Sequence, residues 1–165
     1  MKSTLPLAWR VRAAVAVVVV APLVAVRSFA QLARWLGNGG GMPATAVELD
    51  DAALGRWVDR LLNALRGPWR HTCLRRTAVL YGLLRRAGRP VGLVIGVRRD
   101  VDTTGRLSAH AWLERDGAPY LEADPAIAGR YTVIARFPDA GVSEAKRRRE
   151  TVGRAQAPSP RTSRS

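Results

Sequence analysis

Two stretches in the middle of the chain carry apolar residues at helical spacing. In "LDDAALGRWVDRLLNALRGP" (49–68) an apolar residue recurs every three or four positions, which predicts an amphipathic helix. Asp50 or Asp51 can cap the start of this helix, and Gly67 and Pro68 mark its end. We expect this helix to be structural.

The second helical pattern is "HTCLRRTAVLYGLLRRAG" (71–88), with a buried side that runs along its length. Thr72 can act as the N-cap, and Gly88 followed by Pro90 ends the helix. These boundaries place Cys73 in the first turn.

The period then changes from helical to that of strands. Short β-branched or alternating runs occupy 91–97, 107–114 and 130–137, and the "DG" pair at 116–117 predicts a hairpin from which 118–125 returns. Two helices followed by antiparallel strands predict an α+β fold, with helices packed on a small antiparallel sheet.

The N-terminal part carries the uncharged run "AAVAVVVVAPLVAV" (13–26), in which Pro22 would kink a helix. At about 21 Å as a helix, the run is shorter than a bilayer core of about 30 Å. Three interpretations stay open: a secretory signal, a membrane-surface or short anchoring helix, and a helix that continues through "RSFAQLARWL" (27–36) and packs on the domain or on a partner.

Composition shifts divide the chain into three parts. Residues 1–41 form a basic, apolar helical segment that ends in the Gly-rich linker "GNGGG". Residues 42–140 form the domain, and the basic tail 141–165 has too few large apolar residues to order itself.

Charge and cysteine content narrow the function classes. The 165 residues include 27 Lys and Arg against 13 acids, and this net charge of +14 favours acidic partners. Arginine greatly outnumbers lysine, as is typical of GC-rich genomes, so we do not take the positive charge as evidence of nucleic-acid binding. We expect no nucleic-acid partner. A single cysteine excludes an internal disulfide, and the chain has no CxxC pair and no phosphate-binding or dinucleotide motif. We therefore expect no cofactor.

Cys73 has two interpretations. A thiol becomes a nucleophile as thiolate, and a helix N-terminus favours that anion. Arg75 and Arg76 add positive charge, and backbone N–H groups of the first turn could hold an oxyanion. The ordinary alternative is a small, inert core residue.

A cysteine nucleophile needs a base and a group that orients the base. His110, in the middle of a predicted strand, is the candidate base, because His71 lies too near Cys73 in sequence. A metal site built from these three residues and Asp124 matches no known zinc spacing, so we expect no metal.

Asp124 in "EADP" is the candidate that orients His110, and the length of the hairpin loop decides whether it can. With a two-residue loop at 116–117, His110 pairs with Ala123 and Asp124 faces the other side of the sheet. An odd loop or a bulge pairs His110 with Asp124. Glu122 is the second candidate, for which a solvated strand position is the simpler explanation.

These motifs resemble a known family. A cysteine that opens a helix, a strand with "HAW" and an Asp-Pro beyond a hairpin are similar to the transglutaminase-like, papain-related fold. More narrowly, "CLRRTAVLYGLLRRAGRPVGLVIGVRRD" with "LSAHAWLERDGAPYLE" resembles the leader peptidases of lasso-peptide biosynthesis, over residues 50–137. The resemblance implies a catalytic triad of Cys73, His110 and Asp124.

The same resemblance implies a biological setting. The substrate is a ribosomally made precursor peptide, recognised largely through a separate small leader-binding protein. An ATP-dependent macrolactam cyclase then uses the freed core. The implied location is the cytoplasm, with membrane contact by the N-terminal segment left open. Two alternatives also stay open: another transglutaminase-like acyl transferase or amidase, and a non-catalytic basic protein that binds membrane surfaces or nucleic acid.

Overall fold

The computed structural model of the chain describes residues 5–26, 28–38, 49–99 and 107–138. The predicted tail and most of the predicted Gly-rich linker lie outside the described residues.

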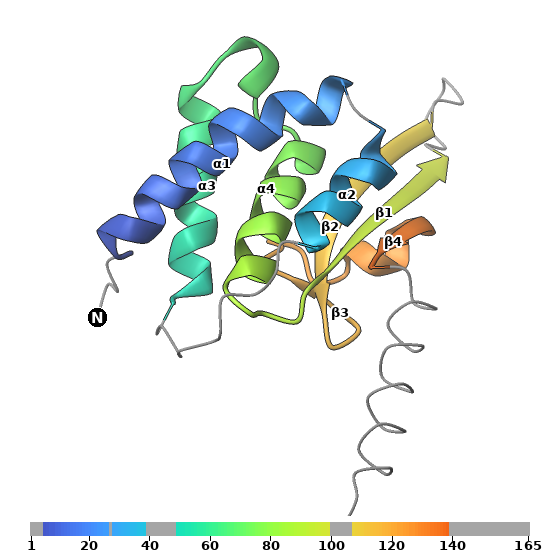
Figure 1. Cartoon of the computed structure of the whole chain (residues 1–165). Coiled ribbons are helices and arrows are strands. Elements are labelled where there is room, and N and C mark those ends of the chain that lie inside the picture. The colour runs from blue at the N-terminus through green and yellow to red at the C-terminus, as the bar shows by residue number, and fades with distance from the viewer. Residues whose placement is uncertain (1–4, 27, 39–48, 100–106, 139–165) are drawn as a thin grey trace, which may run out of the picture.

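The described residues form helices followed by a small sheet, as Figure 1 shows. The α-helices are α1 (Leu7–Val26), α2 (Phe29–Gly37), α3 (Asp51–Ala64) and α4 (Cys73–Arg86), and the short 3₁₀ helices are η1 (Gly67–Trp69) and η2 (Ile127–Arg130). The strands are β1 (Gly92–Arg99), β2 (Leu107–Arg115), β3 (Ala118–Tyr120) and β4 (Thr132–Phe137). They pair antiparallel in the order β3-β2-β1-β4. The predicted α+β class is confirmed.

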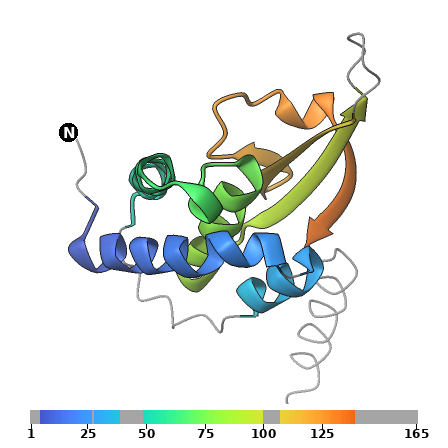
Figure 2. The same ribbon diagram turned by 90° about the horizontal axis from the view of Figure 1, so that it is seen from above.

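Helix α4 is the central element of the fold. It packs on β1 and β2 on one side and against α1, α2 and α3 on the other, so the helices lie together beside the sheet (Figure 2). The ring of Phe29 on α2 meets that of Phe137 on β4 edge-on, with centroids 5.8 Å apart. One hydrophobic core joins all four helices to the sheet.

Both predicted helix caps are present. The Asp50 side chain accepts a hydrogen bond from the backbone N–H of Ala53 at 2.9 Å, which fixes the start of α3. Thr72 Oγ1 accepts from the N–H of Arg75 at 3.3 Å, so α4 begins at Cys73 as the sequence predicts. Local sequence chemistry therefore sets the start of both helices.

The apolar N-terminal run forms a helix that packs on the domain. Six side chains of α1 are buried, among them Trp9 and Val17. Of the three interpretations, the packed helix agrees with this structure except in its length, because α1 ends at Val26 and a separate helix, α2, begins at Phe29. By length and composition α1 could also cross a bilayer, a test that core helices and signal sequences pass as well.

Pro22 creates a contact between α1 and the region of Cys73. Proline has no N–H to donate to the carbonyl four residues earlier, which belongs to Val18. The indole Nε1 of Trp69 donates to that carbonyl instead, at 3.1 Å. Arg75 Nε donates to the Ala21 carbonyl at 3.2 Å, so α1 is bonded both to η1 and to the first turn of α4.

Candidate active site

Cys73 is the first residue of α4, and its side chain is half-buried. Thr72 satisfies two N–H groups of the first turn, since its hydroxyl accepts from Arg75 and its carbonyl accepts from Arg76 at 3.0 Å. The N–H groups of Cys73 and Leu74 make no hydrogen bond within the described part of the chain. Two backbone donors and the positive end of the helix dipole thus lie beside the thiol.

His110 lies on β2 and forms a cluster with two aromatic rings. Its imidazole stacks on Trp112, with centroids 6.2 Å apart and planes 16° apart, and lies 5.6 Å from the ring of Tyr131. The facing residue on β1 is Gly96, where a Cβ would come within 2.7 Å of the Tyr131 Cβ. The absence of a side chain at Gly96 therefore leaves room for the rings that hold His110.

Thr77 docks the start of α4 on this strand. Its hydroxyl is fully buried and donates to the carbonyl of Ala111 at 3.0 Å. Thr77 lies four residues after Cys73 and therefore on the same face of the helix, while Ala111 follows His110 directly. This bond brings the turn that carries Cys73 to the part of β2 that carries His110. No hydrogen bond joins the thiol to the imidazole among the described side chains.

The hairpin after β2 has the two-residue loop, not the odd loop that would pair His110 with Asp124. Arg115 pairs with Ala118, and both loop residues have positive φ, 52° at Asp116 and 81° at Gly117. These angles match a type I′ turn, which suits the twist of the paired strands. Regular pairing stops at Tyr120, so His110 has no partner in β3.

The side chain of Asp124 contacts Ala126 and Arg130 and not His110. Its carboxylate accepts from the N–H of Ala126 at 2.9 Å and pairs with the Arg130 guanidinium at 2.9 Å. The direct pairing of Asp124 with His110 that an odd loop would give is therefore absent. Instead, Asp124 closes the turn that leads into η2.

Glu122 is the carboxylate that faces the imidazole. Its Oε2 lies 3.7 Å from His110 Nε2, and Nε2 is buried with no hydrogen-bond partner. Leu121, just before it, has a positive φ of 58°, which ends the strand alternation after β3. The sequence offered Glu122 as the second candidate, and this local backbone geometry brings it to the histidine.

A half-buried ion-pair network supports Glu122. The Arg76 guanidinium bonds Glu122 Oε1 at 3.1 Å, the carbonyl of Leu121 at 2.8 Å and Asp59 Oδ1 at 2.7 Å. Burial raises the pKa of Glu122 above its usual range, while the positive charges of Arg76 and His110 act against that rise. Arg76 therefore holds both the backbone and the carboxylate of this segment.

His71 and Arg75 have roles apart from His110. His71 Nε2 lies 3.4 Å from Asp59 Oδ1, at the far end of the ion-pair network. Arg75 bonds the carbonyls of Ala21 and Arg70 rather than pointing at the thiol. Asp59 was not predicted as a site residue, because its place on the helix 51–64 is that of an ordinary polar surface position. No group of three or more His, Cys, Asp or Glu that could hold a metal exists among the described residues.

A comparison with family models matches residues 8–136 to the transglutaminase-like superfamily. The chain belongs to the transglutaminase-like superfamily. Comparisons with curated proteins and with solved structures each gave no match. The transglutaminase-like match starts within α1 and ends within β4, and the superfamily commonly contains cysteine peptidases and acyltransferases. A cysteine at the start of the central helix and a histidine on the adjoining strand agree with that chemistry.

Proposed function

We propose that this protein is a cysteine peptidase that removes the leader from a ribosomally made lasso-peptide precursor. The observation that carries the catalytic part is the contact between His110 Nε2 and Glu122, made beside the turn that begins with Cys73. The substrate class rests on the resemblance of the Cys73 helix and the His110 strand to the leader peptidases.

In this proposal Cys73 is the nucleophile and His110 is the base. Because Nε2 faces Glu122, Nδ1 is the ring nitrogen that takes the thiol proton. The thiolate attacks the carbonyl at the junction of leader and core, and the N–H groups of Cys73 and Leu74 hold the oxyanion. The imidazolium then protonates the departing core amine, which leaves a thioester to the leader. Water hydrolyses that thioester and regenerates the thiol.

Glu122 is the orienting carboxylate of this proposal. Its Oε2 faces the imidazole while its Oε1 is fixed by Arg76, so the carboxylate cannot turn away easily. Asp59 in turn holds Arg76, which makes both of them positioning residues. Asp124, the orienting residue implied by the family resemblance, has its own partner in Arg130.

The proposed partners follow the family resemblance. A small leader-binding protein presents the leader, whose next-to-last residue is usually threonine in that family. An ATP-dependent macrolactam cyclase consumes the freed core amine. Neither partner requires a cofactor on this chain.

The test incubates this protein with a precursor peptide, with and without the leader-binding protein, and reads the products by mass spectrometry. We expect two fragments that together exceed the precursor mass by one water, formed much faster when the partner is present. A precursor left uncut under both conditions would contradict the proposal. A product that carries a new amide cross-link, or the loss of a side-chain amide, would instead indicate another acyl transferase or an amidase.

A further inference from the structure

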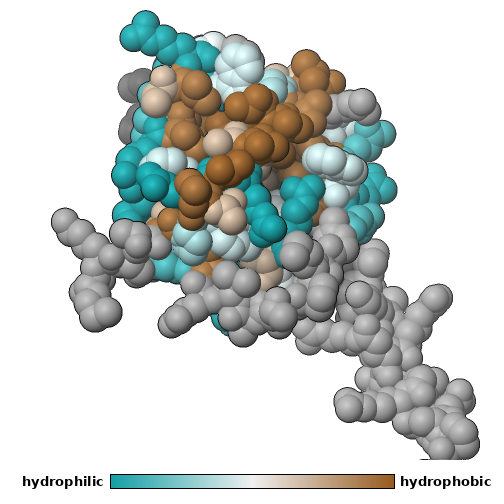
Figure 3. Space-filling model, turned by 60° about the vertical axis from the view of Figure 1, so that its left-hand side comes forward, coloured by the Kyte–Doolittle hydropathy of each residue, from teal (hydrophilic) through white to brown (hydrophobic). Residues whose placement is uncertain are grey.

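The outer face of α1 is an exposed apolar stripe. Of the nine exposed large hydrophobic side chains in the described part of the chain, seven lie on α1 or α2. The six on α1 fall within an arc of about 120° of the helix, at 100° per residue. They are Leu7, Val11, Val15, Val18, Val19 and Val26. Figure 3 shows apolar side chains gathered over this side of the molecule.

Helix α1 is apolar on both of its faces, but the fold covers only one. On its buried face Val17 is 1% and Val20 2% exposed, whereas Val15 on the outer face is 57% exposed. A helix that is apolar all round is normally covered all round, by protein or by lipid. The outer face of α1 therefore needs a cover that the rest of the described chain does not supply.

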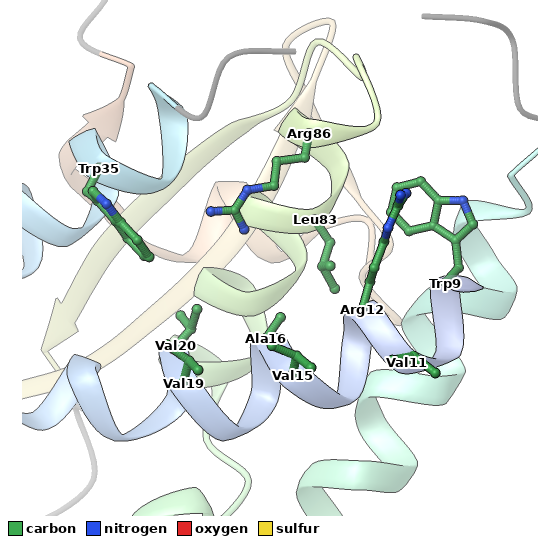
Figure 4. Close-up of a pocket in the computed structure, with 10 residues that line it drawn as sticks. All are labelled: Trp9, Val11, Arg12, Val15, Ala16, Val19, Val20, Trp35, Leu83 and Arg86. Atoms are coloured by element: carbon green, nitrogen blue, oxygen red, sulfur yellow. The ribbon is translucent and has the colours of Figure 1, made fainter. Parts of the chain in front are cut away.

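A groove of about 430 Å³ runs beside this stripe, between α1 and the ends of α2 and α4. Trp9 and Trp35 stand at its two ends, and valines of α1 form one wall (Figure 4). The guanidinium of Arg86 extends over it from α4, and that of Arg12 lies 5.0 Å from the Trp9 ring. The Arg86 guanidinium lies 5.7 Å from the Trp35 ring. Tryptophan and arginine together at the edge of an apolar surface are typical of a lipid–water interface.

Charge narrows the choice of occupant. Residues 1–47 contain no acid, and Arg10 and Arg12 on α1 flank the apolar stripe, so the face attracts anions. A second copy docked symmetrically would bring like charges together, and the segment "KRRR" (146–149) of this chain is itself basic. The stripe carries aliphatic side chains, which offer no hydrogen bonds to specify a protein partner. An anionic bilayer supplies both an apolar layer and phosphates.

We propose that the face formed by the outer stripe of α1, Trp35 and Arg86 docks on an anionic phospholipid bilayer, with α1 lying in the plane of the membrane. The valines enter the acyl region, while Arg12 and Arg86 meet lipid phosphates at its edge. The helix stays packed on the domain in this arrangement, because its buried side is unchanged.

The test measures co-sedimentation of the full chain with vesicles of phosphatidylcholine and phosphatidylglycerol, and with vesicles of phosphatidylcholine alone. We expect binding to the anionic vesicles that weakens as salt rises, and at least about tenfold weaker binding to the neutral ones. The double variant V15D/V19D should lose at least about tenfold in affinity. Its matched control is L107D/I134D, which adds the same charge at exposed apolar positions on β2 and β4 and should bind more tightly than V15D/V19D.

A second pair of variants tests the arginines at constant net charge. R12Q/R86Q should bind anionic vesicles more weakly and with a smaller salt dependence than R130Q/R136Q, which removes two charges from the sheet side. A thermal unfolding scan establishes that each variant folds. The proposal fails if the wild-type protein does not bind the anionic vesicles. It also fails if a test variant and its matched control lose vesicle binding equally. It also fails if V15D/V19D abolishes instead a homodimer or a complex with the leader-binding protein.

Discussion

One oxygen of Glu122 bonds Arg76 at 3.1 Å, and the other lies 3.7 Å from His110 Nε2. The side chain is only 13% exposed, so water screens these interactions weakly. Asp124 is 38% exposed, and its carboxylate accepts from the N–H of Ala126 and pairs with Arg130. At the scale of single residues, the site depends on which of these two acids serves the histidine.

Glu122→Gln should lower kcat/KM for precursor cleavage by on the order of 10²–10⁴, because the neutral amide cannot stabilise the imidazolium. Asp124→Asn is the matched control and should stay within a few-fold of wild type, since it removes only a partly exposed ion pair. Steady-state cleavage assays give both values. The reverse order of the two losses would reinstate Asp124 as the orienting residue.

The raised pKa of Glu122 also predicts a pH dependence of stability. Burial favours the protonated form in the folded state, so this group stabilises the fold most below its ordinary pKa of about 4.5. That contribution is lost as pH rises through the higher folded-state pKa. The unfolding free energy of wild type minus that of Glu122→Gln should therefore fall as pH rises from about 4.5, measured by urea unfolding. A difference that grows with pH would mean that the pKa is lowered.

At the scale of elements, the docking of α4 on β2 decides where Cys73 and His110 meet. Thr77→Val keeps the size of the side chain but removes the donor to the Ala111 carbonyl. We expect a loss of about 1–3 kcal/mol in unfolding free energy, from a buried carbonyl left without its partner. Thr77→Ser is the control that keeps the hydroxyl. Equal stability of the valine variant and wild type would show that this bond does not hold the helix.

The ends of helices and the hairpin could be predicted from the sequence where interactions between neighbouring residues determine them. Thr72 and Asp50 cap their helices through their own next turn, and the Asp116–Gly117 pair forms its hairpin from its own φ preferences. The position of Glu122 was not readable, because it follows from a left-handed Leu121 and from Arg76, 46 residues away along the chain. Counting residues from the hairpin loop did not predict which acid faces His110, because the count assumed a regular strand beyond Tyr120.

At the scale of the whole molecule, α1 belongs to the same hydrophobic core as the catalytic elements. It also bonds Trp69 on η1 and Arg75 in the first turn of α4. A chain that begins at Ser28 should therefore lose its cooperative thermal transition, because the core side of α1, including Trp9, would be missing. A chain that begins at Leu5 is the control and should unfold as wild type does. A cooperative transition in the shorter chain would establish residues 1–27, which include α1, as a separable segment.

The central claim is that Cys73 is the nucleophile of a peptidase. The most direct test compares wild type with Cys73→Ala, each supplied with the precursor and the leader-binding protein, with fragments followed by mass spectrometry. A thermal unfolding scan establishes that the variant folds. The account predicts two fragments from wild type and none from Cys73→Ala, a loss of at least about 10³-fold in rate. Cleavage by Cys73→Ala at a rate near that of wild type would contradict it.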